Sequence, residues 1–197
     1  EVVYINRTAG VSSTSIREQG QLLTLGIIGD ATTARKMTEE LLYVSGIQAG
    51  DVCSVPGNLE NADAVMEKSD AIYLLAEPAR RGALVKKALE SGCHVICESP
   101  VSLNGNETKR LYKYAQEKGL VLFDAIKTAY FRAFSRLVLL VKGGVVGSVK
   151  SIDATCTSMQ PSNNWFYNKE SKGGSMTDWG PFVLLPVFKI FGLGYRE

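Results

Sequence analysis

The stretch that decides the fold is LLTLGIIGDATTA, residues 22–34. It opens on a short apolar run, residues 22–28, of the kind that lies buried in a parallel sheet. A turn follows, and a helix is predicted over about residues 33–44. This order of strand, turn and helix is typical of dinucleotide-binding folds, in which the start of the helix presents unpaired N–H groups to a diphosphate.

The turn carries part of the dinucleotide fingerprint. Gly29 and Ala34 provide its first glycine and its last small residue, but Ala31 replaces the middle glycine that lets a diphosphate come close. Thr32 or Thr33 could cap the helix and offer a hydroxyl to a phosphate. We therefore expect Gly29, Ala31, Thr32 and Thr33 to contact a cofactor, with a plain structural turn as the alternative.

Two features count against a complete fingerprint. Asp30 would repel phosphates unless its side chain points away from them. The second strand is predicted at residues 52–55, and residues 56–58 after it lack the carboxylate that usually holds the ribose. NAD and NADP therefore both stay open as cofactors. The short stretch before the next strand suggests that one helix–strand unit is missing.

The same order of strand and helix then repeats. Apolar strands are predicted over residues 71–76, 94–97 and 120–123, and helices over residues 59–68, 81–91 and 106–118. Such repetition predicts an α/β fold with a Rossmann-like, doubly wound parallel sheet.

Beyond residues 125–128 the pattern changes. A helix is predicted over residues 131–141, and residues 149–157 alternate between apolar and polar side chains. Alternation gives a strand one dry and one wet face, so we expect the start of an α+β domain with an open, mainly antiparallel sheet. A polar loop over residues 163–174 and a helix over residues 178–191 complete this part.

Composition excludes several classes of function. The 22 basic and 20 acidic residues are scattered and form no basic stripe, so nucleic acid is not an expected partner. The sequence contains neither an apolar run of membrane-spanning length nor a leader segment at its start, so no membrane association is expected. The four cysteines lack the paired spacing of metal ligands, which favours buried thiols in a cytoplasmic protein and no metal site.

The segment ALESGCHVICESP, residues 88–100, resembles the signature A-L-x-x-G-K-H-V-x-x-E-K-P of the Gfo/Idh/MocA family of glucose–fructose oxidoreductases and inositol dehydrogenases. Further matches follow in the family's order, among them GGSMTDWG, residues 173–180, for G-G-x-x-x-D-x-G. The resemblance implies a Rossmann domain, a substrate domain with a large sheet that commonly mediates self-association, and an NAD(P)-dependent activity on a sugar or polyol.

The departures from this family concern its catalytic pair. The lysine of E-K-P and a histidine two residues after D-x-G steady the substrate oxygen and move its proton in the family. Ser99 and Phe182 hold these positions here. A phenyl ring carries no proton and a serine hydroxyl only hydrogen-bonds, so the usual route for the proton is absent.

Other residues could replace the missing pair. Lys127 and Tyr130 follow the end of a parallel strand, where open α/β sheets bind ligands, and could supply a proton. The alternatives are a solvated charge and a packed ring. Asp178 keeps its family position and could orient the substrate, or it could cap a helix instead. The resemblance also places Glu98 and Pro100 at the nicotinamide.

For two further side chains, a structural role is weighed against a functional one. His94, the one histidine of the chain, lies inside a strand and matches a structural histidine of the family. Trp165 could stack on a sugar ring, although a packing role in its loop is the commoner explanation.

The first residues resemble a different enzyme. RTAGVSST, residues 7–14, is similar to the R-T-x-G-x-S-T-T segment of glycerol-3-phosphate-type cytidylyltransferases. Those enzymes also need two histidines in an H-x-G-H motif, which a chain with one histidine lacks. We therefore expect residues 1–20 to be a nucleotidyltransferase remnant, residues 21–126 a dinucleotide-binding domain and residues 127–197 a truncated substrate domain, in a fragment whose ends look cut.

Two hypotheses follow. The first is an NAD(P)-dependent oxidoreductase with non-standard catalytic residues, in a protein fused to a nucleotidyltransferase. The second is a family member without catalytic activity, which binds a nucleotide or sugar and regulates or scaffolds its fused partner.

Overall fold

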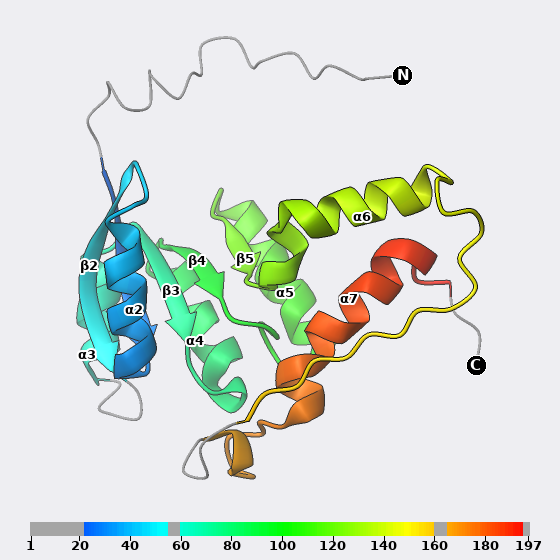
Figure 1. The fold of residues 1–197 in the computed structure, drawn as a ribbon. Helices are drawn as coiled ribbons and strands as arrows, with labels where there is room; N and C mark the ends of the chain where they lie inside the picture. The colour runs from blue at the N-terminus through cyan, green and yellow to red at the C-terminus, as the bar shows by residue number, and fades with distance from the viewer. Residues whose placement is uncertain (1–21, 55–59, 160–164, 195–197) are drawn as a thin grey trace. The chain divides into compact units, whose positions relative to one another are not determined.

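The computed structural model describes residues 22–54, 60–159 and 165–194. Figure 1 shows strands and helices that alternate along most of this chain. The strands are β1 (Leu23–Gly29), β2 (Ile47–Ser54), β3 (Ala71–Leu75), β4 (His94–Cys97) and β5 (Leu122–Asp124). The helices are α2 (Ala31–Leu41), α3 (Glu60–Glu67), α4 (Pro78–Glu90), α5 (Gly105–Glu117), α6 (Arg132–Lys142) and α7 (Gly180–Phe191).

The five strands form one sheet in the order β2-β1-β3-β4-β5. β1 pairs in parallel with β2, and β4 pairs in parallel with β5. The chain thus places β2 on one side of β1 and then returns to place β3, β4 and β5 on the other side, which is the arrangement of a doubly wound sheet. The predicted Rossmann-like α/β fold is therefore confirmed.

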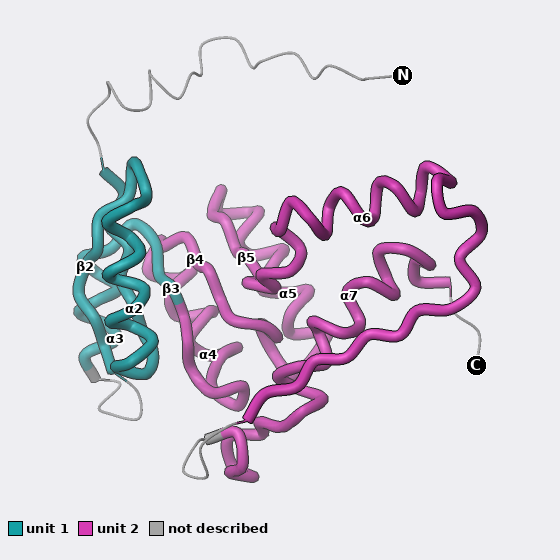
Figure 2. The backbone as a smooth tube through the Cα atoms, in the orientation of Figure 1, with its two compact units in different colours: residues 1–73 teal, residues 74–197 magenta. Residues whose placement is uncertain are grey.

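The chain divides into two compact units, residues 1–73 and 74–197, which Figure 2 distinguishes by colour. The division falls within β3. It differs from the predicted domain limits at residues 20 and 126, and those limits stay predictions.

The first unit packs helices against β1. Ile27 and Ile28 are fully buried, and Val65 and Met66 of α3 are buried as well. Gly26 allows this packing, because a Cβ atom there would lie 2.7 Å from Cγ1 of Val65. The local sequence thus sets how closely α3 approaches β1.

The bounds of β2 differ from the prediction. It begins at Ile47 and not at residue 52, so the series β1-α2-β2-α3-β3 is complete and no helix–strand unit is missing. Most of its residues are exposed or half-buried, as suits a strand at the edge of the sheet. A search for apolar runs misses such a strand, because only its end is buried. Residues 56–58, where no ribose-binding carboxylate was found, lie outside the described residues.

The second unit is built on β4, β5 and the helices α4 and α5. Its core contains Val95 and Cys97 from β4 and Val85 and Leu89 from α4. His94 accepts a hydrogen bond at Nδ1 from the N–H of Val121, at 3.0 Å, and so ties β4 to the chain that enters β5. The structural role predicted for His94 is confirmed.

The alternating segment at residues 149–157 was predicted as a strand of a second sheet, and this prediction is wrong for the structure. These residues have no regular secondary structure, and although Ile152 and Cys156 are half-buried, Ala154 between them is exposed, against the predicted alternation. A strand needs a neighbour to satisfy its N–H and C=O groups. No other strand in the described part of the chain pairs with this segment.

The remaining general expectations concern cysteines, membranes and metals. All four cysteines are thiols, and Cys53, Cys93 and Cys97 are buried, as expected. None of the described helices is both long enough and apolar enough to cross a membrane. Within the same residues no three His, Cys, Asp or Glu side chains are grouped to hold a metal ion.

Candidate functional site

In the first unit, the turn after β1 places a carboxylate at the start of α2. Asp30 is the N-cap of α2, and its Oδ1 accepts a hydrogen bond from the N–H of Thr33 at 2.9 Å. The expectation that Thr32 or Thr33 caps the helix is therefore wrong. Ala34 is buried, in keeping with the small residue that the fingerprint requires for packing of the helix.

The Asp30 side chain does not point away from the helix start. It takes one of the N–H groups that a diphosphate would use, and it adds negative charge there. Ala31 and Thr32 are exposed at the same helix start, while Gly29 is buried at the end of β1. The turn thus leads from β1 into a helix start, and the side chain of Asp30 already occupies one of the N–H groups there.

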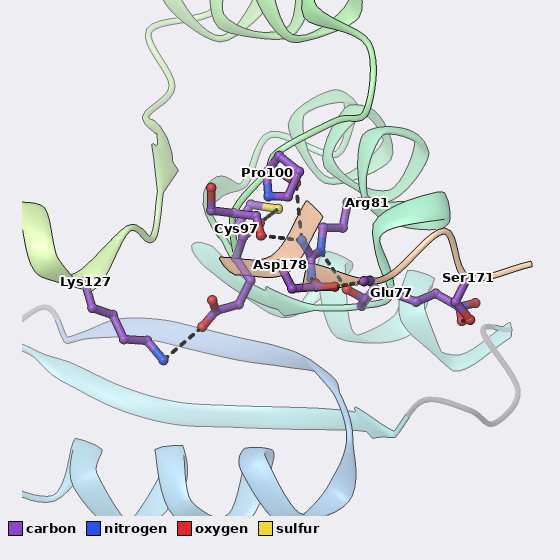
Figure 3. Close-up of polar contacts among 11 residues, drawn as sticks. Glu77, Arg81, Cys97, Pro100, Lys127, Ser171 and Asp178 are labelled. Carbon is purple, nitrogen blue, oxygen red and sulfur yellow. Dashed lines mark hydrogen bonds and ion pairs between the residues drawn. The ribbon is translucent and has the colours of Figure 1, made fainter. Parts of the chain in front are cut away.

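In the second unit, a buried arginine links three segments of the chain (Figure 3). Arg81 lies on α4 and is 3% exposed. Its Nε donates to the carbonyl oxygen of Ala76 at 2.7 Å and its Nη1 to that of Ser99 at 2.6 Å. Its Nη2 lies 3.9 Å from Oδ1 of Asp178. Burial lowers the pKa of Arg81, and the anions around it oppose that shift.

Sequence reasoning missed Arg81, although a signal was present. The residue shares the helix face of Leu84, Val85 and Ala88, which is otherwise apolar. A charged residue on a buried face needs partners, and here backbone carbonyl groups and one carboxylate provide them.

Asp178 is held by the same network. It lies in a single π-helical turn, Ser175–Trp179, and its Oδ2 accepts a hydrogen bond from the N–H of Gly174 at 2.8 Å. Burial raises the pKa of Asp178, while the Gly174 hydrogen bond and Arg81 lower it. It does not cap α7, whose N-cap is Trp179. The capping alternative is therefore wrong.

A short loop fixes the approach to this turn. Ser171 is 2% exposed, and its hydroxyl donates to Oε2 of Glu77 at 2.6 Å. The N–H of Ala79 donates to the carbonyl oxygen of Ser171 at 3.1 Å. The loop is thus anchored at the start of α4, one turn before Arg81. The side chain of Trp165 lies outside the described part, so its predicted contact with a sugar stays a prediction.

Lys127 lies beside Glu98. Its Nζ is 3.2 Å from Oε1 of Glu98, and the two side chains are 61% and 18% exposed. Glu98 follows β4, and Lys127 begins a 3-10 turn that follows β5. The structure therefore brings together two residues that the sequence singled out separately. Tyr130, at the end of the same turn, stacks on Phe123 with ring centroids 4.6 Å apart.

The two family-like segments line one pocket. Its lining includes Ser99 and Pro100 of one segment and Thr177 and Gly180 of the other. Its volume is about 490 Å³, and side chains of α7 such as Leu184 provide apolar walls. Phe182, at the position of the family's histidine, is not among the lining residues; its ring lies 6.2 Å from that of Trp179.

Asp124 is the second site residue that sequence reasoning did not select. It ends β5 and borders the same pocket as Ser99. Its Oδ1 is buried without a hydrogen-bond partner among the described residues. Burial raises the pKa of Asp124, whereas a hydrogen bond with the Ser99 side chain and the charge of Arg81 lower it. The signal in the sequence was a carboxylate at the end of a parallel strand.

Comparisons with known proteins agree with this description. Residues 31–125 match the family model described as "Oxidoreductase family, NAD-binding Rossmann fold", that of Gfo/Idh/MocA. A dTDP-3,4-didehydro-2,6-dideoxy-alpha-D-glucose 3-reductase from Streptomyces violaceoruber is 30% identical over 141 residues, which cover 70% of this chain and 41% of the relative. A scyllo-inositol 2-dehydrogenase (NADP(+)) from Bacillus subtilis is 26% identical, over 62% of this chain and 39% of the relative.

Solved structures share the fold. A 3-ketoreductase from Actinomadura kijaniata, in complex with NADP and TDP-benzene, has a TM-score of 0.67 at 20% identity, over 87% of this chain and 58% of the other. A biliverdin reductase from Synechocystis, in complex with biliverdin and NADP+, has a TM-score of 0.68 at 19% identity, over 88% of this chain and 60% of the other. The chain spans about two fifths of the length of the curated relatives described above. The family model and the relatives thus show similarity to the Gfo/Idh/MocA family over the residues that match.

Proposed function

We propose that this chain is part of an NAD(P)-dependent oxidoreductase of the Gfo/Idh/MocA type that acts on a sugar or polyol. One observation carries the proposal: Ser99 and Pro100 of the E-x-P segment line the same pocket as Thr177 and Gly180 of the D-x-G segment. A pocket with mostly apolar walls and a few convergent polar groups suits a small molecule. The relatives that act on dTDP-sugars and inositol support the substrate class.

The cofactor is NAD or NADP. We assign the turn of Gly29, Ala31, Thr32 and Thr33 to its diphosphate, and Glu98 and Pro100 to its nicotinamide end. When bound, the nicotinamide would exchange the hydride with the substrate carbon. Asp30 must release the N–H of Thr33 for the diphosphate to use that donor, because its carboxylate holds it at 2.9 Å.

Lys127 is assigned to the substrate oxygen. The ion pair with Glu98 fixes the position of its Nζ, and its ammonium group could stabilise negative charge on that oxygen. Tyr130 follows in the same turn and is the second candidate for this contact, with a ring held by Phe123. Asp178 acts on the site indirectly, because Gly174 and Arg81 already engage its carboxylate.

A second candidate function is a ligand-binding protein without catalysis. The phenyl ring of Phe182, in place of a histidine, favours it. In this version the chain binds a nucleotide or sugar and regulates a fused partner. The cytidylyltransferase-like residues 7–14, which lie outside the described residues, would belong to that partner.

Titration of the full chain with NADPH and NADH, followed by cofactor fluorescence, tests the oxidoreductase. Binding of either cofactor, together with NADP⁺-dependent oxidation of scyllo-inositol as probe substrate, is expected. Lys127→Ala should then lower turnover, whereas Lys150→Ala, at an exposed lysine outside the site, should not. Absence of binding by both cofactors at millimolar concentration contradicts the proposal. Cofactor binding without turnover of any sugar or polyol favours the second function.

A further inference from the structure

The two segments that line the pocket are joined behind it by one guanidinium group (Figure 3). Nη1 of Arg81 donates to the carbonyl oxygen of Ser99 at 2.6 Å and, at 3.5 Å, to that of Pro100. Ser99 and Pro100 both line the pocket. Nη2 of Arg81 lies 3.9 Å from Oδ1 of Asp178, which directly follows the lining residue Thr177. Arg81 itself is not among the lining residues, so it joins both segments without facing a ligand.

The position of the guanidinium group is fixed by backbone groups. Its Nε donates to the carbonyl oxygen of Ala76, directly after β3, at 2.7 Å, and the whole residue is buried. The planar fork of N–H donors in an arginine holds several acceptors in one defined geometry, which the single ammonium group of a lysine cannot do. Because the contacts with carbonyl oxygens are short and the contact with Asp178 is longer, the backbone fixes the guanidinium group, and this group in turn orients Asp178.

The turn that carries Asp178 is closed on itself. The N–H of Gly174 donates to Oδ2 of Asp178, and the N–H of Asp178 donates to the carbonyl oxygen of Gly174, both at 2.8 Å. The loop before this turn is anchored at the start of α4 through Ser171. α4 therefore holds this part of the chain at two points, and the contact between Arg81 and Asp178 is the one next to the pocket.

The charge of Arg81 acts on the same region. Asp178, Glu98 and Asp124 all interact electrostatically with its guanidinium group. Burial raises the pKa of Asp178 and of Asp124, and the charge of Arg81 opposes both shifts. Asp124 is itself a lining residue of the pocket. Arg81 thus favours the charged form of carboxyl groups in the pocket and beside it.

We propose that Arg81 is a positioning residue of the substrate pocket. It sets how the E-x-P segment with Ser99 and Pro100 lies relative to the D-x-G segment with Asp178, and thereby how tightly the pocket binds a sugar or polyol. The inference rests on the proposed oxidoreductase function. It adds no chemical step, because Arg81 is buried behind the residues that line the pocket.

The first test separates positioning from stability by steady-state kinetics with scyllo-inositol and NADP⁺. Arg81→Lys keeps the charge but loses the planar fork, so KM should rise and kcat/KM should fall by up to about 100-fold. A variant that is only less stable contains fewer active molecules, which lowers the apparent kcat and leaves KM unchanged. Arg80→Lys, one residue away on α4 and half exposed, is the matched control and should keep the KM of the wild type. An unchanged KM in Arg81→Lys overturns the positioning role.

The second test replaces the other partner of the contact. In Asp178→Asn the side-chain oxygen can still accept from the N–H of Gly174, while the charge that faces Arg81 is lost. KM should rise here as well. In the double variant with Arg81→Lys, KM should rise by clearly less than the product of the two single effects, because both substitutions break the same contact. Effects that multiply would show that Arg81 and Asp178 act independently, which contradicts the proposal.

The third test needs neither cofactor nor substrate. A ¹³C NMR titration of the full chain follows the side-chain carboxyl groups, and Asp178→Asn identifies the signal of Asp178 by its loss. Arg81→Gln removes the positive charge and should raise the pKa of Asp178, whereas Arg80→Gln should leave it where it is. The same pKa in Arg81→Gln as in the wild type overturns the link between the two side chains.

The outcomes separate the two proposals. If NADPH binds, scyllo-inositol is oxidised and Arg81→Lys keeps the KM of the wild type, the positioning role is overturned and the oxidoreductase stands. If neither NADPH nor NADH binds to the wild-type chain, the oxidoreductase falls and takes the role of Arg81 in substrate binding with it. If Arg81→Lys does not fold, the KM of Asp178→Asn decides, because this variant leaves Arg81 and its carbonyl partners in place.

Discussion

At the scale of single residues, Asp30 sets a conflict between helix stability and phosphate binding. Its carboxylate caps α2 through the N–H of Thr33, which strengthens the helix start. The same carboxylate places a negative charge where a diphosphate would bind. In the proposed function, the charge of Asp30 would weaken the binding of a dinucleotide at this turn.

A neutral N-cap at position 30 would separate the effect of Asp30 on the helix from its effect on phosphate binding. Asp30→Asn keeps an N-cap of similar strength but removes the charge, so the affinity for NADPH should rise about tenfold, or ~1.4 kcal/mol. Fluorescence titration measures the affinity, and chemical unfolding measures the stability. Asp30→Ala is the control: it also removes the charge but should cost about 1 kcal/mol of stability. Unchanged or weaker NADPH binding by Asp30→Asn would show that the turn holds no diphosphate.

Arg81 is a buried residue that joins three segments of the second unit. Arg81→Met leaves two buried backbone carbonyl groups without their donor and Asp178 without its ion-pair partner, which should lower the free energy of unfolding by about 3–5 kcal/mol. Arg80→Met, one residue away, removes an ion pair between Arg80 and Glu77 in which the arginine is half exposed, and should cost at most about 1 kcal/mol. Urea unfolding of both variants checks the difference. Equal losses would contradict the role given to Arg81.

At the scale of elements, the start of β4 is tied to the chain before β5 by a side chain as well as by the backbone. The N–H of Val95 donates to the carbonyl oxygen of Val121 at 2.8 Å, and Nδ1 of His94 accepts from the N–H of Val121. This pairing positions Asp124, Lys127 and Tyr130 at and beyond the end of β5.

Substitution of His94 tests that link. His94→Leu removes the acceptor for the N–H of Val121 and should lower stability by about 1 kcal/mol. His94→Asn offers a carbonyl oxygen at a similar place and should lose clearly less. Thermal unfolding compares the two variants. A larger loss in His94→Asn than in His94→Leu would argue that packing, and not the hydrogen bond, is the contribution of His94.

At the scale of the whole molecule, the buried carboxyl groups make stability depend on pH. Burial raises the pKa of Asp124 and of Asp178 above the ordinary value of 3.8, so the folded state binds their protons more tightly than the unfolded state does. Such a group contributes stability that is fully present below the unfolded pKa and is lost as pH rises through the folded pKa.

The prediction concerns the difference between the wild type and Asp124→Asn, which has no proton to lose. From about pH 4 upward, the wild type should lose stability relative to this variant until Asp124 is fully ionised. Urea unfolding at a series of pH values measures both proteins. A difference that stays constant with pH, or that changes in the opposite direction, would contradict the raised pKa.

Sequence patterns predicted the frame of this protein well because they are local. Strands such as β1, which is buried from Leu25 onward, and helices such as α4 are recognisable from apolar runs and from helical spacing, whatever the rest of the chain does. The exceptions were β2, whose exposed first part gives no apolar signal, and residues 149–157, whose alternation finds no partner strand.

The sequence by itself determined the alternating fold, and it placed Ser99 and Phe182 where the resemblance to the family would have a lysine and a histidine. Only the tertiary structure decided which polar groups meet, as in the contact between Glu77 and Ser171, which lie 94 positions apart. The pairs Arg81–Asp178 and Glu98–Lys127 likewise join segments that no local pattern connects. Their reason is physical: a buried charge or hydroxyl takes whatever partner folding brings within hydrogen-bond reach, and that partner is set by the packing of strands and helices and not by spacing along the chain.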